Sequence, residues 1–336
     1  MVVGGAKKTT RSYVLGFALL GNDSNDETAD EASVKDRLRA WWNGDELPAR
    51  PAPLGGNRKK SEQKSHDDGD ADGAVAGGTL DNSWPETRRK LAEKLWSAGF
   101  ALPGGTDYAE SLVSGCSLTA AETMLEIGIG MGGGTRIIIG KFGNYVSGYE
   151  RDADLAAAAT HHAVTYNIDD KLVVKTVPFE DLNLKSKYFR AALMREIVYT
   201  IEDKARLITK ISGSLKSGGS HLVMTDLLFD ADDGSEELAA WKAVEGRPVY
   251  PWTEAALTKA LGRAELQPRI IDDESEEYCA MVVDAWSEYM KTIEGAEIAP
   301  EMGRVLAHEG EYWARRVAAL KAGVLHYYRI EAVKDT

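Results

Sequence analysis

The sequence is poor in cysteine, in positive charge and in long hydrophobic runs. Only Cys116 and Cys279 occur among 336 residues, far apart and outside any CxxC pair, so a disulfide framework or a thiolate zinc site is not expected. The net charge of -13 argues against a surface that binds nucleic acid, because such binding depends on lysine and arginine. No grouping of His, Asp and Glu has convincing metal-ligand spacing, so no metal is predicted.

The longest apolar stretch near the start, YVLGFALLG (Tyr13 to Gly21), is too short to span a bilayer. The chain is therefore expected to be cytoplasmic. In residues 33–43, Val34, Leu38, Trp41 and Trp42 form one apolar helical stripe. Docking on the chain's own main domain, weak peripheral contact with a membrane and contact with a partner all fit this short basic amphipathic helix.

Composition divides the chain into two parts. Residues 55–83 contain a basic block followed by an acidic block, with six glycines and no aromatic residue, which predicts a disordered linker. Residues 1–83 are thus interpreted as a partly disordered N-terminal extension, and residues 84–336 as the main domain.

Within the main domain, strand-like and helix-like segments alternate. Strands are predicted at 123–129, 145–150, 171–177, 189–194 and 220–229, with a helix between each two of them except between the third and the fourth. Such β-α alternation predicts an α/β fold in which a parallel sheet carries helices on both faces. A late strand is predicted in VLHYYRIEAVK, after a long excursion.

The stretch MLEIGIGMGGGT (Met124 to Thr135) joins the first predicted strand to the first following helix. Its GIGMGG matches GxGxxG, and Glu150 lies 22 residues after Gly128, at the end of the second strand. These two features fit a nicotinamide dinucleotide and S-adenosylmethionine about equally. Glu126 favours the second cofactor, because a carboxylate suits an ammonium and a sulfonium better than it suits a pyrophosphate.

Three motifs in residues 100–230 carry a family resemblance. LEIGIGMGG, SGYERD and SLKSGGSHLVMTD resemble motifs of class I S-adenosylmethionine-dependent methyltransferases. More narrowly, LPGGTDYAESLV and LMREIVYTIEDK are similar to small-molecule methyltransferases that act on phosphoethanolamine or on sarcosine and dimethylglycine. The resemblance implies a Rossmann-like, mostly parallel sheet with an antiparallel last strand, and an acceptor-side insertion near 227–252.

The resemblance also implies roles for individual residues. The glycines of the turn would let the backbone close over the methionine part of S-adenosylmethionine, Glu126 would orient its amino group, and Glu150 would hold its ribose. The expected cofactor-binding residues are Gly104, Glu126, Gly128, Gly130, Gly132, Glu150, Arg151, Phe179, Glu180 and Arg195. Glu196 and Tyr199 are the expected catalytic residues, and both are expected to point into the acceptor cavity.

The acceptor itself stays open at this stage. The chain has Thr200 where the phosphoethanolamine enzymes have histidine, so their base mechanism is not carried over. The resemblance implies transfer of a methyl group to a small-molecule or lipid-like acceptor, with the methylated atom and the oligomeric state undetermined. An NAD-dependent oxidoreductase, and a non-catalytic scaffold that keeps the fold, are the alternatives.

Overall fold

A computed structural model describes residues 83–231 and 233–335. The helix predicted at 33–43 and the linker predicted at 55–83 lie outside the described residues, Ser83 excepted. The boundary at residue 84 and the membrane contact therefore stay predictions.

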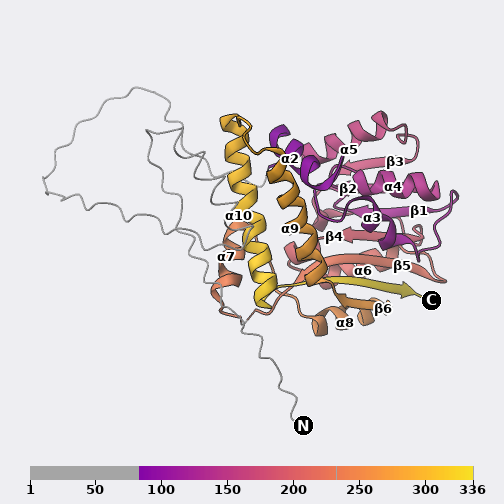
Figure 1. The fold of residues 1–336 in the computed structure, drawn as a ribbon. Helices are drawn as coiled ribbons and strands as arrows, with labels where there is room; N and C mark the ends of the chain where they lie inside the picture. Colours follow the sequence, from indigo (N-terminus) through magenta and orange to yellow (C-terminus); the bar gives the residue numbers. More distant parts are fainter. Residues whose placement is uncertain (1–82, 232, 336) are drawn as a thin grey trace, which may run out of the picture. The chain divides into compact units, whose positions relative to one another are not determined.

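A seven-stranded sheet with the order β3-β2-β1-β4-β5-β7-β6 forms the centre of the fold (Figure 1). Strands β1 to β5 run parallel, whereas β7 pairs antiparallel with both β5 and β6. The predicted α/β sheet with an antiparallel last strand is confirmed. The strands are Thr123–Ile127 (β1), Tyr145–Glu150 (β2), Leu172–Thr176 (β3), Ala191–Arg195 (β4), Ser220–Leu228 (β5), Gln267–Asp273 (β6) and His326–Lys334 (β7).

Helices cover both faces of this sheet. On one face Leu112, Ile138 and Ala159 pack against the strands, and on the other face Ile208 and Leu261 do so. These residues come from α3, α4, α5, α6 and α8, respectively. The helices are Glu86–Trp96 (α2), Gly105–Val113 (α3), Gly133–Phe142 (α4), Ala153–Thr165 (α5), Lys204–Ser214 (α6), Glu236–Val244 (α7), Glu254–Arg263 (α8), Ser275–Thr292 (α9) and Pro300–Ala322 (α10), with 3-10 turns at Phe179–Asp181 (η1) and Val198–Thr200 (η2).

The local sequence explains where several of these helices begin and end. Asp152 precedes α5, and its carboxylate accepts hydrogen bonds from the amides of Asp154 and Leu155. Pro300 occupies the first turn of α10, where its missing N–H costs nothing. Gly143 ends α4 in the left-handed conformation that glycine adopts readily.

A second group of helices lies at one end of the sheet. Helix α10 packs against α7, α9 and α2, and Figure 1 shows α9 and α10 side by side. Leu227 and Leu228 belong to β5, so only the later part of the insertion expected at 227–252 forms a separate element, α7 with its flanking loops. Within the described residues, no helix is both long enough and apolar enough to cross a bilayer.

Candidate functional site

The glycine-rich turn between β1 and α4 requires glycine at three positions. Gly128, Gly130 and Gly132 have φ angles of 76°, 59° and 81°, a region that other residues rarely adopt. The amides of Gly128 and Ile129 donate to the carbonyl of Tyr149 on β2, which fixes the turn at the carboxyl ends of the strands. The geometry is that of a backbone shaped to approach a ligand closely.

The segment between α2 and α3 packs directly on this turn. The amide of Gly133 donates to the carbonyl of Gly99 at 2.9 Å, and a Cβ on Gly133 would lie 2.6 Å from the Gly99 backbone. On the outer side, Nδ1 of His162 lies 2.9 Å from the carbonyl oxygen of Met131. The turn is therefore held from two sides.

Glu150 is the centre of hydrogen bonding beside the turn. Its carboxylate accepts from the amide of Gly130 at 2.9 Å, from that of Arg151 at 2.8 Å and from that of Asp152 at 3.0 Å. Burial raises the pKa of Glu150, although these backbone hydrogen bonds act in the opposite direction. Because a carboxylate offers about four lone-pair sites, one remains for a ligand hydroxyl.

Glu126 is also buried, at 6% exposure, and accepts a hydrogen bond of 2.6 Å from the hydroxyl of Thr135. Burial raises its pKa to about 7, and the Thr135 hydrogen bond and the charge of Arg195 oppose this rise. Apart from Thr135, no side chain of the described residues donates a hydrogen bond to this carboxylate. A cationic group would favour its ionised form.

Arg195 lies beside Pro103, the residue that precedes Gly104 at the start of α3. The Arg195 guanidinium donates to the carbonyl of Pro103 at 2.6 Å and lies 5.4 Å from the centre of the Tyr108 ring. Its Nε has no hydrogen-bond partner among the described residues. Gly104 has a φ of 105°, and a Cβ there would lie 2.6 Å from the Tyr108 ring.

Phe179 and Arg151 form the other side of the turn. Phe179 is 1% exposed, and the Arg151 guanidinium lies 5.1 Å from the centre of its ring. Arg151 also donates to the hydroxyl of Thr200 at 3.1 Å. Glu180, by contrast, has an exposed side chain.

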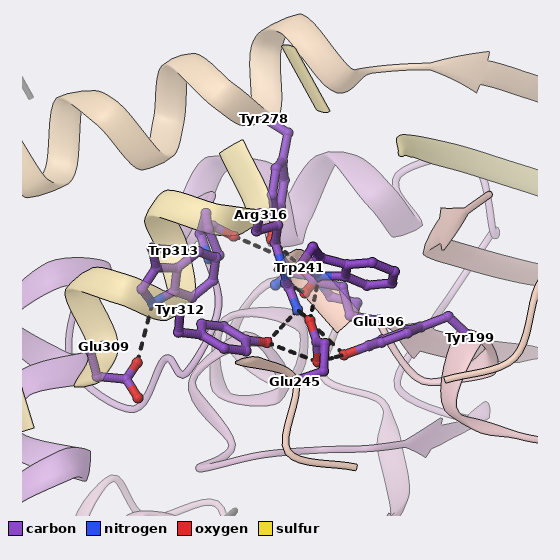
Figure 2. A network of polar contacts seen from close by, with 11 residues as sticks. Glu196, Tyr199, Trp241, Glu245, Tyr278, Glu309, Tyr312, Trp313 and Arg316 are labelled. Atoms are coloured by element: carbon purple, nitrogen blue, oxygen red, sulfur yellow. Dashed lines mark hydrogen bonds and ion pairs between the residues drawn. The ribbon is translucent and has the colours of Figure 1, made fainter. Parts of the chain in front are cut away.

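Glu196 and Tyr199 belong to a buried polar cluster around Arg316 of α10, which Figure 2 shows. The guanidinium pairs with the carboxylates of Glu196 and of Glu245, the latter at 2.7 Å. We use the name Arg316 cluster for Glu196, Tyr199, Glu245, Tyr278, Tyr312 and Arg316. The three tyrosine hydroxyls all contact the guanidinium.

The two expected catalytic residues differ in their contacts within the Arg316 cluster. Glu196 has a φ of 53°, a strained conformation for a residue with a side chain, and such strain is common at functional sites. Its carboxylate accepts from the hydroxyl of Tyr278 at 2.9 Å. The Tyr199 hydroxyl donates to Glu245 at 2.9 Å, and burial together with that carboxylate raises the pKa of Tyr199 well above 10.

Arg247 stands near this cluster without an ion pair among the described residues. Its charge acts on Tyr199, Tyr312 and Arg151, and its Nε is buried without a hydrogen-bond partner. The amide of Tyr250, three residues further on, donates to the carbonyl of Tyr199 at 2.8 Å. This hydrogen bond places the Arg247 segment beside η2.

The structure thus brings most of the sequence-predicted residues together at the carboxyl ends of β1, β2 and β4. Sequence reasoning missed Glu245, Tyr278, Tyr312, Arg316 and Arg247. A charged residue among the apolar and aromatic positions of α10 is the signal that could have pointed to Arg316 and to its neighbour Tyr312. No group of three or more His, Cys, Asp or Glu able to hold a metal ion occurs in the described residues.

Comparisons with known proteins bear on this arrangement. Residues 125–223 match the model of a methyltransferase domain family. Phosphoethanolamine N-methyltransferase 2 of Caenorhabditis elegans is 30% identical over 139 residues, which are 39% of this chain and 30% of that protein. The chain spans about a third of the length of the curated relatives it matches.

Solved structures share the fold at low identity. Phosphoethanolamine N-methyltransferase 2 of Haemonchus contortus, in complex with phosphomonomethylethanolamine and S-adenosylhomocysteine, superposes with a TM-score of 0.67 at 17% identity, covering 76% of this chain and 59% of that one. A candidate sarcosine dimethylglycine methyltransferase from Galdieria sulphuraria gives 0.62 at 13% identity, covering 74% and 99%.

Proposed function

The chain carries a class I S-adenosylmethionine-dependent methyltransferase domain, and on that premise we propose that it methylates a small acceptor that bears an anionic group. This assignment of the domain decides between the two cofactors that the glycine pattern left open. The proposal about the acceptor rests on one observation. Arg247 is a cation beside the Arg316 cluster that has no ion pair among the described residues.

The residues of the glycine turn fit S-adenosylmethionine. Three left-handed glycines leave the backbone open to the methionine part, and the free lone pair of Glu150 would accept from a ribose hydroxyl. Glu126 would hold the amino group, and Phe179 would flank the adenine. When bound, the cofactor supplies an activated methyl group on a sulfonium, and the protein contributes alignment and exclusion of water.

An arginine without an ion pair among the described residues supports an anionic acceptor. The two terminal nitrogens of Arg316 contact two carboxylates and three hydroxyls, so they have little capacity left for a further anion. Arg247 and Arg151 lie near each other, and their like charges disfavour each other. A phosphate or carboxylate beside Arg247 would relieve that repulsion.

The relatives agree with this acceptor class. Phosphoethanolamine, named in the Caenorhabditis relative, carries a phosphate, and sarcosine, named in the Galdieria structure, carries a carboxylate. Both molecules also carry an amine. An acceptor that combines an amine with an anionic group is therefore the first choice for this chain.

Glu196 is the better proton acceptor of the two expected catalytic residues. Its carboxylate lies at the end of β4 beside Arg195, and among the described residues it takes hydrogen bonds only from Tyr278 and Arg316. Tyr199 keeps its phenolic proton because its pKa is raised well above 10, so its role is to hold Glu245 in place. Glu196 would receive the proton that an amine releases after methylation.

A comparison of matched acceptors tests the proposal. Purified full chain is given labelled S-adenosylmethionine with phosphoethanolamine or ethanolamine, and with sarcosine or sarcosine amide. We expect kcat/KM to favour the anionic member of a pair. Arg247→Met should lower kcat/KM for that member about tenfold, as expected for loss of one charged hydrogen bond, and leave the neutral member unchanged.

The exposed Arg263 on α8 provides the control, since Arg263→Met removes the same charge from another part of the domain. Equal loss for both members of a pair, or an unchanged preference in Arg247→Met, would contradict an anion-binding role. Tight cofactor binding without transfer to any acceptor would instead favour the scaffold alternative.

A further inference from the structure

His162 on α5 lies where the end of α2 meets the glycine turn. Its Nδ1 is 2.9 Å from the carbonyl oxygen of Met131, which belongs to the turn. Its Nε2 is 3.4 Å from Oε1 of Glu93 on α2. The same Glu93 oxygen accepts a hydrogen bond of 2.9 Å from the amide of Gly99. One imidazole ring therefore joins α5, the turn and the segment that follows α2.

Residues 97–104, which we call the covering segment, lie against the glycine turn. A Cβ on Gly133 would come within 2.7 Å of the Phe100 ring. A Cβ on Gly99 would lie 3.0 Å from Cα of Gly133 and 3.2 Å from Nδ1 of His162. Gly99 thus lies between the turn and the His162 ring, and it can move away from the turn only if these contacts change.

Both partners of the His162 ring can only accept hydrogen bonds. A backbone carbonyl and a carboxylate have no hydrogen to donate, so the contacts to Met131 and Glu93 are both satisfied only when Nδ1 and Nε2 each carry one. The charged imidazolium meets this condition. A neutral ring that donates to Met131 would direct the lone pair of Nε2 at the Glu93 carboxylate, and the contact would become repulsive. Histidine is also the side chain that most readily changes charge near neutral pH.

The charged and titratable groups around the ring have opposing effects on its charge. Glu93 favours the imidazolium. The guanidinium of Arg136 on α4, 4.4 Å from the centre of the Tyr166 ring, opposes it, and that ring is centred 6.1 Å from the His162 ring. His161 has an exposed side chain, and its ring is also centred 6.1 Å away. Among these described residues, Glu93 alone lies within ion-pair distance of the His162 ring.

We infer that His162 is a positioning residue for the cofactor site, which as an imidazolium holds the covering segment against the glycine turn. Its proton strengthens cofactor binding, because the turn is then held in the form that meets the ligand. The contribution is present while the ring is charged and is lost as the pH rises and the ring loses its proton. This inference rests on the cofactor assignment and adds to it a residue that acts through Gly99 and Met131.

The first measurement needs no ligand. Hydrogen exchange of the full chain, read by mass spectrometry, compares the peptides that contain Gly99 and Gly133 in the wild-type chain and in His162→Gln at the same pH. At pH 6 these peptides should exchange about fivefold faster in the variant, as expected for loss of one partly exposed charged contact. At pH 8 the two chains should exchange equally. His161→Gln is the matched control and should behave like the wild-type chain at both pH values.

The second measurement is calorimetric titration with S-adenosylhomocysteine at the same two pH values. Glu126 also titrates in this range, but it does so in every chain, so the ratio of the variant's dissociation constant to that of the wild-type chain isolates His162. For His162→Gln this ratio should be about five at pH 6 and close to one at pH 8.

The partner residue gives a further check on the same contact. Glu93→Gln keeps an oxygen that can accept from Gly99 but removes the charge that faces His162. It should weaken S-adenosylhomocysteine at pH 6 to a similar extent. The double variant should bind no more weakly than either single variant, because the two substitutions remove the same interaction.

Three results would overturn the inference. A ratio of dissociation constants that is the same at both pH values would mean that His162 acts through packing and not through its charge. Equal exchange in the wild-type chain and His162→Gln at pH 6 would mean that the ring does not hold the covering segment. Faster exchange with a ratio of one would mean that the contact serves the fold alone. Failure of the wild-type chain to bind S-adenosylhomocysteine is distinguishable from all three, since it would contradict the proposed function while the exchange measurement still decided whether His162 holds the covering segment.

Discussion

Replacement of Glu126 by glutamine tests how much the buried carboxylate destabilises the fold and how much it contributes to cofactor binding. Glutamine keeps an oxygen that can accept from Thr135, but it cannot ionise. Burial raises the pKa of Glu126 from 4.5 to about 7. The folded wild-type chain therefore holds a proton at pH values where the unfolded chain has lost it, and its stability falls as the pH rises from 4.5 to about 7.

The size of this effect follows from the difference of about 2.5 between the two pKa values. Each tenfold change in an ionisation constant corresponds to about 1.4 kcal/mol. Glu126→Gln should therefore raise the free energy of unfolding by about 3 kcal/mol at pH 8, and by only about 1 kcal/mol at pH 5. Urea denaturation of both chains without ligand at the two pH values measures the difference.

Bound cofactor should reduce this difference in stability. An ammonium beside the ionised carboxylate stabilises the wild-type chain, so S-adenosylhomocysteine should raise wild-type stability more than that of Glu126→Gln at pH 8. A variant that is no more stable than the wild-type chain at pH 8, or that gains equally at both pH values, would refute the reasoning about Glu126.

Three further predictions concern stability, each checked by thermal or urea denaturation. Gly133→Ala places a Cβ 2.6 Å from the Gly99 backbone and should lower the free energy of unfolding by about 1–3 kcal/mol. Gly140→Ala, in the same helix with open space around it, should raise that free energy by about 0.5–1 kcal/mol. Equal effects of the two substitutions would contradict the close approach of Gly133 to Gly99. Arg88→Met leaves the buried carboxylate of Glu309 without its ion pair of 2.7 Å and should cost about 3–5 kcal/mol, most of it recovered by adding Glu309→Leu. Asp152→Ala removes the cap of α5 and should cost about 1 kcal/mol.

One prediction concerns turnover with an acceptor that the chain methylates. Glu196→Gln should lower kcat strongly, because it removes the group proposed to receive the proton. Tyr199→Phe should lower kcat less and leave the pH profile unchanged, because the tyrosine keeps its proton throughout the working range. Unchanged turnover in both variants would refute a role for either residue.

The local part of the site could be predicted from the sequence. The spacing of the turn predicts a left-handed backbone at Gly128, Gly130 and Gly132. Glu126 and Glu150 lie at fixed offsets from these glycines. The β-α alternation predicts the parallel strands because each buried strand is a short apolar run. These features can be recognised in a single sequence because each depends on residues that are close together in the chain.

The acceptor side could not be predicted in the same way. Arg316 meets Glu196 and Glu245 across 120 and 71 positions of the chain, and no periodicity joins them. A buried ion pair looks in sequence like two ordinary surface charges until the fold brings them together. Tyr327 belongs to a predicted strand, but its place on the same sheet face as Arg195 and Thr225 follows only from the pairing of β7 with β5.

Calorimetric titration of the full chain with S-adenosylhomocysteine and, separately, with NAD tests the central claim most directly. The account predicts one binding site per chain for S-adenosylhomocysteine at pH 8, weakened by Glu126→Gln, and no binding of NAD. Binding of NAD with none of S-adenosylhomocysteine would contradict it.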